Sequence, residues 1–116
     1  MKMYKADLHI HTCLSPCADL EMSPRSIVKA AKTKGLDIAG ICDHNSAENV
    51  PGAKRSAERE GLYMIGGMEI TSSEEVHILA FFDNEEDLFA MQHIIYANLP
   101  GCNDEKRFGE QVVVNE

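Results

Sequence analysis

The chain has 116 residues, 44% of them hydrophobic, which is enough for one domain with a packed core and excludes wholesale disorder. Its formal net charge of -8 disfavours a nucleic-acid-binding surface on this segment, because phosphate backbones favour basic patches. The sequence shows neither a secretory signal nor an apolar run of membrane-spanning length. We therefore expect a cytoplasmic protein with no membrane partner.

The first part of the chain predicts two strands separated by a helix. Residues 4–11 alternate in polarity and are typical of a strand, and a loop follows. Ser23 and Pro24 predict the start of a helix, because serine caps helices and proline suits their first turn, and Gly35 ends it. Residues 36–44 are nearly continuously apolar, which is typical of a strand buried on both faces of a parallel sheet.

A second helix and a third strand follow. The helix is expected over residues 51–60, closed by Gly61. The strand is expected over residues 62–70, where Gly66 and Gly67 either weaken its middle or mark a bulge.

The last expected elements are a strand over residues 75–82, a helix over residues 85–98 capped by Asn84, and a strand over residues 111–115. The connection before residue 75 is so short that it favours a hairpin over a helical crossover. The resulting order, β-α-β-α-β-β-α-β, predicts an α/β fold.

Potential metal ligands follow the carboxyl ends of the first three predicted strands. His9 and His11 end the first, His44 ends the second and Glu69 ends the third. In a parallel sheet these ends meet at one rim, where ligands bind. His9 and His11 are two residues apart on a strand, so both imidazoles point to the same face. A buried Glu69 without a cation would be costly, so the pattern predicts a metal site.

Two aspartates are candidates for supporting these ligands. Asp7 shares a strand face with His9 and is expected to accept a ring N–H from a metal-binding imidazole. Asp43 either does the same or binds a metal directly. A histidine in isolation is more often an ordinary structural residue, and we interpret His93 in this way; His77 would be interpreted likewise if it stood alone.

The cysteines give a weaker signal. Cys13 and Cys17 invite a zinc interpretation, but no second cysteine pair completes a structural zinc site. Disulfides are rare in a reducing compartment, so small buried cysteines near a site are the default interpretation.

The sequence resembles the polymerase and histidinol phosphatase (PHP) domain family, and most of all its small stand-alone phosphoesterases. The resemblance implies the N-terminal part of a distorted barrel of seven β/α units, with up to three metals at its carboxyl-end rim. The matching stretches occur in the family's order and are DLHIHT (7–12), SPCAD (15–19), CDHN (42–45), GMEI (67–70) and EVHILAFF (75–82).

The resemblance also implies roles for individual residues. His9 and His11 would bind a first metal, which Glu69 would bridge to a second metal bound by His77. His44 would bind a third metal, and Glu69 and His44 are the expected catalytic residues.

An aspartate often completes the third site in the family, within an HTxxSDG motif. This chain has Pro16 where that aspartate would stand, and Asp19 is the nearest carboxylate, so we give it this role.

Other family ligands, a later histidine and an aspartate and histidine near the domain's end, have no counterpart here. A whole barrel takes about 250 residues. We therefore expect residues 1–116 to form a single but incomplete PHP domain, its N-terminal portion, or a short protein that completes its site with a second copy. Exposed sheet edges predict an oligomer, a domain swap or a poorly ordered C-terminus.

The expected activity is hydrolysis of a phosphoester by metal-activated water, with two or three zinc, manganese or iron ions as cofactors. The substrate would be a small phosphorylated metabolite or a nucleotide, whose charge the ions would offset in an acidic protein. One alternative is a polymerase- or nuclease-associated module, which would need a basic groove or added domains. A further alternative is a non-catalytic metal-binding remnant, favoured by the missing later ligands.

Overall fold

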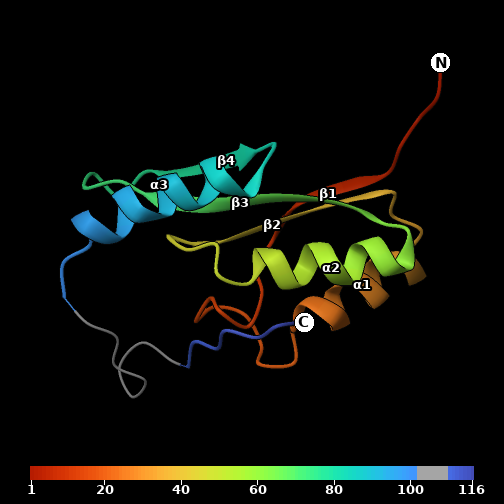
Figure 1. Cartoon of the computed structure of the whole chain (residues 1–116), viewed down its shortest axis with the longest axis horizontal. Helices are drawn as coiled ribbons and strands as arrows, with labels where there is room; N and C mark the ends of the chain where they lie inside the picture. The colour runs from red at the N-terminus through yellow and green to blue at the C-terminus, as the bar shows by residue number, and fades with distance from the viewer. Residues whose placement is uncertain (102–109) are drawn as a thin grey trace.

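The computed structural model describes residues 1–101 and 110–116. Within these described residues, seven helices and strands follow one another in the expected order (Figure 1). Their bounds are β1 Ala6–Ile10, α1 Pro24–Thr33, β2 Ile38–His44, α2 Val50–Glu60, β3 Tyr63–Thr71, β4 His77–Phe82 and α3 Glu85–Asn98.

The strands form one sheet in the order β1-β2-β3-β4. β1, β2 and β3 are parallel, as the buried apolar run of β2 predicts, and residues 39–43 of β2 are all buried. β4 runs antiparallel to β3, so the predicted hairpin is confirmed. Three carboxyl ends, together with the beginning of β4, therefore lie at the same end of the sheet.

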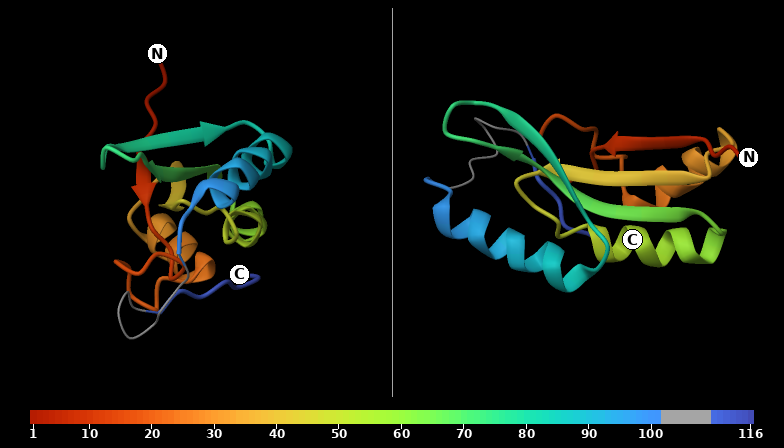
Figure 2. Two further views of the ribbon diagram at one scale, coloured as in Figure 1. Left: turned by 90° about the vertical axis from the view of Figure 1, so that its left-hand side faces the viewer. Right: turned by 90° about the horizontal axis from the view of Figure 1, so that it is seen from above.

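The helices bury one face of this sheet. α1 and α2 pack against each other on the same side, and α3 packs against β3 and β4 (Figures 1 and 2). Their apolar side chains form one core with β2 and β3, which includes Val28, Ile41, Val50, Met68 and Leu88.

Local signals in the sequence explain where the helices begin and end. The Ser23 side chain accepts a hydrogen bond from the backbone N–H of Ser26, at 3.2 Å, and so caps α1. Asn84 caps α3 in the same way through the N–H of Asp87, at 2.8 Å. Gly61 ends α2 with a φ of 70°, a left-handed conformation that glycine adopts without a steric penalty.

A bulge in β1 lies at Leu8 and His9. The register between β1 and β2 shifts between Asp7 and Ile10. On β2, Gly40 makes room for it, because a Cβ at that position would lie 2.9 Å from the carbonyl oxygen of Leu8. In β3 the pairing with β4 continues through Gly66 and Gly67, so the bulge considered there is absent.

The strand expected over residues 111–115 is wrong. The backbone N–H of Val112 donates to the carbonyl of Cys13, at 3.0 Å, and that of Val114 donates to the Asn49 side chain, at 2.9 Å. Loops and the start of α2 thus take up these amides one at a time, and no strand ladder forms there. Among the described residues, no helix is long and apolar enough to cross a membrane.

Candidate metal centre

Four imidazoles surround the carboxylate of Glu69, which is 5% exposed near the end of β3. Its Oε1 lies 2.7 Å from Nε2 of His9 and 3.9 Å from Nε2 of His11. Its Oε2 lies 2.9 Å from Nδ1 of His44 and 3.0 Å from Nδ1 of His77. Each carboxylate oxygen therefore faces its own pair of histidines.

The sheet register produces this convergence. His44 is the direct partner of Glu69 in the pairing of β2 with β3. On the other side, Glu69 pairs with Leu79 of β4. His77 precedes Leu79 by two residues and so points to the same face of the sheet. The antiparallel direction of β4 brings His77 to the rim.

The charge state of these groups suits metal binding. Burial acts to raise the pKa of Glu69, but hydrogen bonds from His77 and His9 and the proximity of His44 outweigh it, so the pKa is lowered. Burial, followed by the proximity of His44, lowers the pKa of His11. Both shifts favour the forms that bind metals, an ionised carboxylate and a neutral imidazole.

The His11 ring is held in one tautomer by Ser15. The Ser15 hydroxyl lies 2.7 Å from the carboxylate of Asp43 and has only one proton, which it donates to that acceptor. Nδ1 of His11, 3.1 Å from the Ser15 oxygen, must then donate its own proton. This leaves the lone pair on His11 Nε2, which lies 3.1 Å from Nε2 of His9.

Asp43 organises the loop after β1 and acts on the metal centre through Ser15. It is 1% exposed and accepts hydrogen bonds from the backbone N–H and the hydroxyl of Thr12, both at 2.6 Å. Asn49 in turn donates to the Thr12 hydroxyl, at 3.0 Å. Sequence reasoning proposed Asp43 as a supporting residue but missed Thr12, Ser15 and Asn49, because single loop residues carry no spacing signal.

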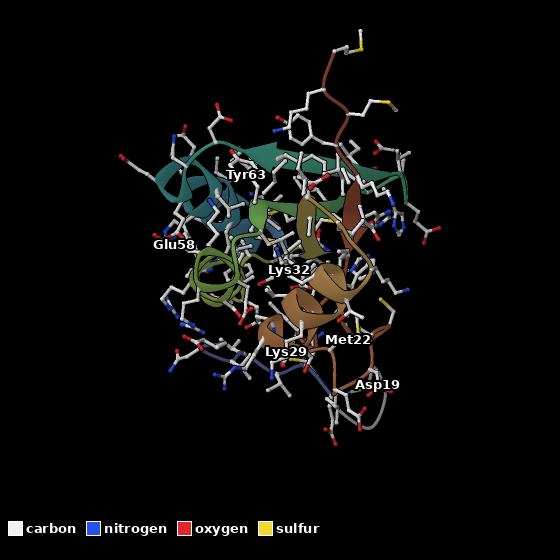
Figure 3. The ribbon with its side chains drawn as sticks, turned by 90° about the vertical axis from the view of Figure 1, so that its right-hand side faces the viewer. Asp19, Met22, Lys29, Lys32, Glu58 and Tyr63 are labelled. Atoms are coloured by element: carbon white, nitrogen blue, oxygen red, sulfur yellow. The ribbon has the colours of Figure 1, made fainter. Side chains whose placement is uncertain are left out.

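Asp7 and Asp19, the two other aspartates predicted for the site, accept hydrogen bonds from the backbone. Asp7 accepts the backbone N–H of His9, at 3.1 Å, and not a ring N–H. Asp19 is exposed on the loop before α1, where it accepts the N–H of Glu21, at 2.9 Å (Figure 3). His93 is an exposed residue of α3.

In the part of the chain that the structure describes, three groups of donors are close enough to hold a cation, with one ligand atom from each residue and all atoms within 4.8 Å of one another. Among the described residues, Asp19 belongs to none of these groups. Imidazole and carboxylate donors together suit zinc, manganese or iron, so the residues present fit the metals that the sequence predicts. The groups are His9–His11–Glu69, His44–Glu69–His77 and His11–Cys17–His44.

Residues 7–110 match the sequence profile described as the PHP domain. The chain belongs to the PHP domain family. An uncharacterized protein of Methanocaldococcus jannaschii is 36% identical over 90 residues, which cover 71% of this chain and 52% of that protein. A Haemophilus influenzae protein named 5'-3' exoribonuclease is 32% identical over 65% of this chain and 27% of its own length. This PHP chain thus spans about half of one curated relative and less of the other.

Solved structures confirm the fold of the PHP chain. A Bifidobacterium adolescentis protein, whose given name proposes a metal-dependent phosphoesterase, is 28% identical with a TM-score of 0.64. The match covers 83% of this chain and 33% of that one. A protein from Chromobacterium violaceum, named an amidohydrolase, has a TM-score of 0.62 at 22% identity and supports the fold alone. The α/β arrangement is the N-terminal part of a PHP-type barrel.

Proposed function

We propose that this PHP domain chain takes part in the hydrolysis of a phosphoester at a centre of two or three divalent metal ions. One observation carries the proposal. The buried carboxylate of Glu69 presents one oxygen to His9 and His11 and the other to His44 and His77. A carboxylate placed between two imidazole pairs is suited to bridge two cations.

The ligands divide between the ions in a simple way. His9, His11 and one oxygen of Glu69 would hold the first ion, and His77 and the other oxygen would hold the second. His44 belongs to the second group and also to the group with His11 and Cys17, and it would serve the second or a third ion. Bound divalent ions would supply an acidified water and a positive field for the phosphoryl oxygens. Zinc, manganese and iron all fit these donors.

The protein's own side chains orient and hold this centre. Glu69 stays ionised because the surrounding imidazoles lower its pKa. Ser15 fixes the His11 tautomer and is 1% exposed, so its hydroxyl cannot reach a substrate and is no candidate nucleophile. Glu69 and His44 are the residues we propose as catalytic, because they would contact the ions beside the reacting phosphoryl group.

Further ligands are proposed to come from outside the described residues. The chain matches 33% of the Bifidobacterium structure, which leaves room for other parts of a PHP domain to contribute. Residues 1–116 would then be the N-terminal portion of one domain, completed by further chain or by a second copy in a homo-oligomer. A phosphorylated small molecule is the proposed substrate, and the cytoplasm is the proposed compartment.

A nuclease activity is the second candidate. It is favoured by the similarity to the named exoribonuclease and to a protein named DNA polymerase III PolC-type from Staphylococcus haemolyticus, which is 27% identical over 79% of this chain and 6% of its own length. The same centre would hydrolyse a phosphodiester at a nucleic-acid end. The net charge of -8 makes this chain alone a poor surface for long nucleic acids.

The test compares substrates on protein that has been freed of metal and reloaded with zinc, manganese or iron(II). Release of phosphate from p-nitrophenyl phosphate supports the first proposal, and stepwise nucleotide release from a 5'-phosphorylated oligoribonucleotide supports the second. Metal binding without either reaction, both in this chain and in a longer form that supplies the remaining ligands, would contradict both and leave a non-catalytic metal-binding domain.

Two variants make the test specific. His9→Ala is expected to lose the ion of the first group and any hydrolysis while the fold is retained, because His9 is a rim residue outside the core. His93→Ala is the matched control, since it removes an exposed imidazole on α3. Equal metal content in both variants would contradict the role of His9.

A further inference from the structure

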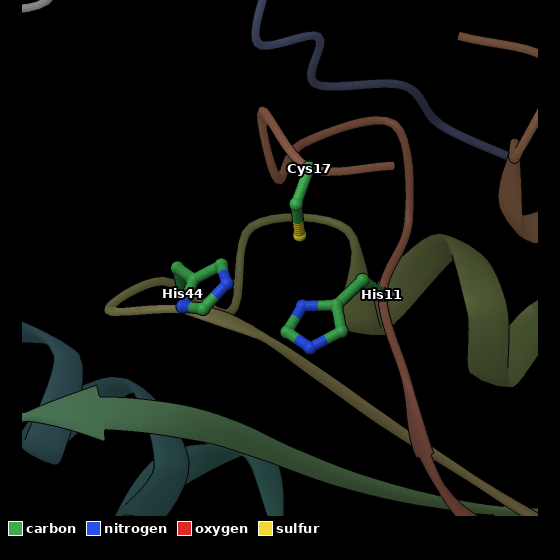
Figure 4. A group of neighbouring side chains, drawn as sticks. All are labelled: His11, Cys17 and His44. Atoms are coloured by element: carbon green, nitrogen blue, oxygen red, sulfur yellow. The ribbon is translucent and has the colours of Figure 1, made fainter. Parts of the chain in front are cut away.

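Cys17 directs its thiol toward two imidazoles of the metal centre. It lies on the loop between β1 and α1, and in Figure 4 its sulfur faces the rings of His11 and His44. One ligand atom of each of the three residues lies within 4.8 Å of the other two. The two imidazole rings are stacked, with centroids 4.6 Å apart, and so present their edges together.

We propose that Cys17 binds a metal ion as a thiolate, together with His44 and beside His11. This inference rests on the metal centre proposed above and adds a sulfur ligand to it. The resemblance of the sequence suggested Asp19 as the ligand from this loop. The structure brings Cys17 to the histidines instead, while Asp19 bonds to the backbone of its own turn.

The loop holds Cys17 in place before any metal binds. Ser15 is anchored by its hydroxyl to Asp43 and also accepts the backbone N–H of His44, at 3.1 Å. The N–H of Ala18 donates to the carbonyl of Ser15, at 3.0 Å, and closes a tight turn around Cys17. The thiol is therefore tied by short links to the strand end that carries His44.

The spacing requires only a small adjustment. Zinc–sulfur bonds of about 2.3 Å and zinc–nitrogen bonds of about 2.0 Å place the donors of one tetrahedral ion roughly 3.3–3.6 Å apart. The donors here lie within 4.8 Å of one another. Cys17 is exposed and so is free to turn its side chain by the remaining ångström or so.

A sulfur ligand changes which metals the centre prefers. Thiolates favour zinc and other soft ions, whereas carboxylates and water suit manganese and magnesium. The one free lone pair of the His11 ring serves the first ion, and His44 also belongs to the group with Glu69 and His77, so Cys17 extends one linked centre and does not form a separate site. We therefore expect Cys17 to strengthen zinc binding and to leave manganese binding unchanged.

Cobalt(II) is the probe that detects this ligand directly, because a cobalt–thiolate bond gives an intense charge-transfer absorption in the near ultraviolet. The parent chain titrated with cobalt is expected to show this band, Cys17→Ser to lose it and Asp19→Asn to keep it. A band that persists in Cys17→Ser, or cobalt bound to the parent without a band, would overturn the inference. Far-ultraviolet circular dichroism checks the fold of each variant.

Affinity measurements give a second readout that is independent of activity. In competition with a chelator, Cys17→Ser is expected to weaken zinc binding about 10-fold or more and to change manganese binding less than twofold. Equal losses for both metals would contradict a role for sulfur.

Phosphate release from p-nitrophenyl phosphate, assayed on the same samples, separates this inference from the proposed function. A charge-transfer band without hydrolysis would reject the function and retain the thiolate ligand. Hydrolysis by a chain that shows no charge-transfer band would retain the proposed function and reject the thiolate ligand.

Discussion

Replacement of Asp43 by asparagine is expected to destabilise the metal-free protein strongly. The Asp43 carboxylate is 1% exposed and accepts three hydrogen bonds, two from Thr12 and one from Ser15. An asparagine of nearly the same shape has only one acceptor oxygen. Its amide group would therefore face at least one of these donors.

The expected loss follows from these three bonds. Two of the bonds would remain but would no longer have a charged acceptor. The contribution of each to the free energy of unfolding would then fall from about 2 to about 1 kcal/mol. The third places the asparagine NH₂ against the Thr12 hydroxyl, whose oxygen already accepts from Asn49. The third bond, also worth about 2 kcal/mol, is thereby lost, which brings the total to about 4 kcal/mol. For a domain of this size such a loss lowers the melting temperature by roughly 15 °C.

The assay is urea unfolding of chelator-treated protein, followed by circular dichroism. Asp37→Asn is the matched control, because Asp37 accepts a single backbone N–H, from Lys5 at 2.8 Å, at the other end of the sheet. We expect that control to lose less than about 1 kcal/mol. A loss for Asp43→Asn no larger than the control's would refute the view that Asp43 holds the loop together.

Three further results are expected. Ser15→Ala removes the acceptor of the His11 Nδ1 proton, so affinity for the first metal should fall about 10- to 100-fold in chelator competition; unchanged affinity would contradict the tautomer argument. Gly67→Ala places a Cβ against the carbonyl oxygen of Ala80 and should cost about 1–3 kcal/mol in urea unfolding, whereas a neutral result would mean that the β-hairpin adjusts freely. Burial raises the pKa of the Cys42 thiol to about 11, so only about one thiol in a thousand is ionised at pH 8; mass spectrometry should find iodoacetamide labelling far slower there than at exposed Cys17, and equal rates would contradict its burial.

Much of the fold follows from local signals in the sequence. The caps Ser23 and Asn84 and the terminator Gly61 define helix ends through short-range hydrogen bonds and a backbone conformation that depends on neighbouring residues only. The apolar run of β2 predicts its burial in a parallel sheet for the same reason. The strand predicted over residues 111–115 does not form, because residues that favour β-structure form a strand only where a partner strand is available, and here loops occupy that place.

The site was predictable where strand geometry dictates it. His9 lies near the end of β1 and His11 directly after it, and their two-residue spacing places their Nε2 atoms together, while the order of strand ends brings in Glu69. Ser15 and Cys17 depend instead on the path of a loop, which long-range hydrogen bonds to Asp43 determine. No periodicity in the sequence encodes the path of a loop. The sequence therefore predicts the nearest carboxylate, Asp19, as the ligand from this loop, whereas the structure has Cys17 beside His11 and His44.

Glu69 is proposed to bridge two metal ions, and crystals of the chain grown with zinc would show this when measured at the zinc absorption edge. We expect anomalous peaks about 2.0–2.2 Å from each oxygen of Glu69, one shared with His9 and His11 and one with His77. Zinc bound elsewhere, with the Glu69 carboxylate still hydrogen-bonded to the imidazoles alone, would contradict it.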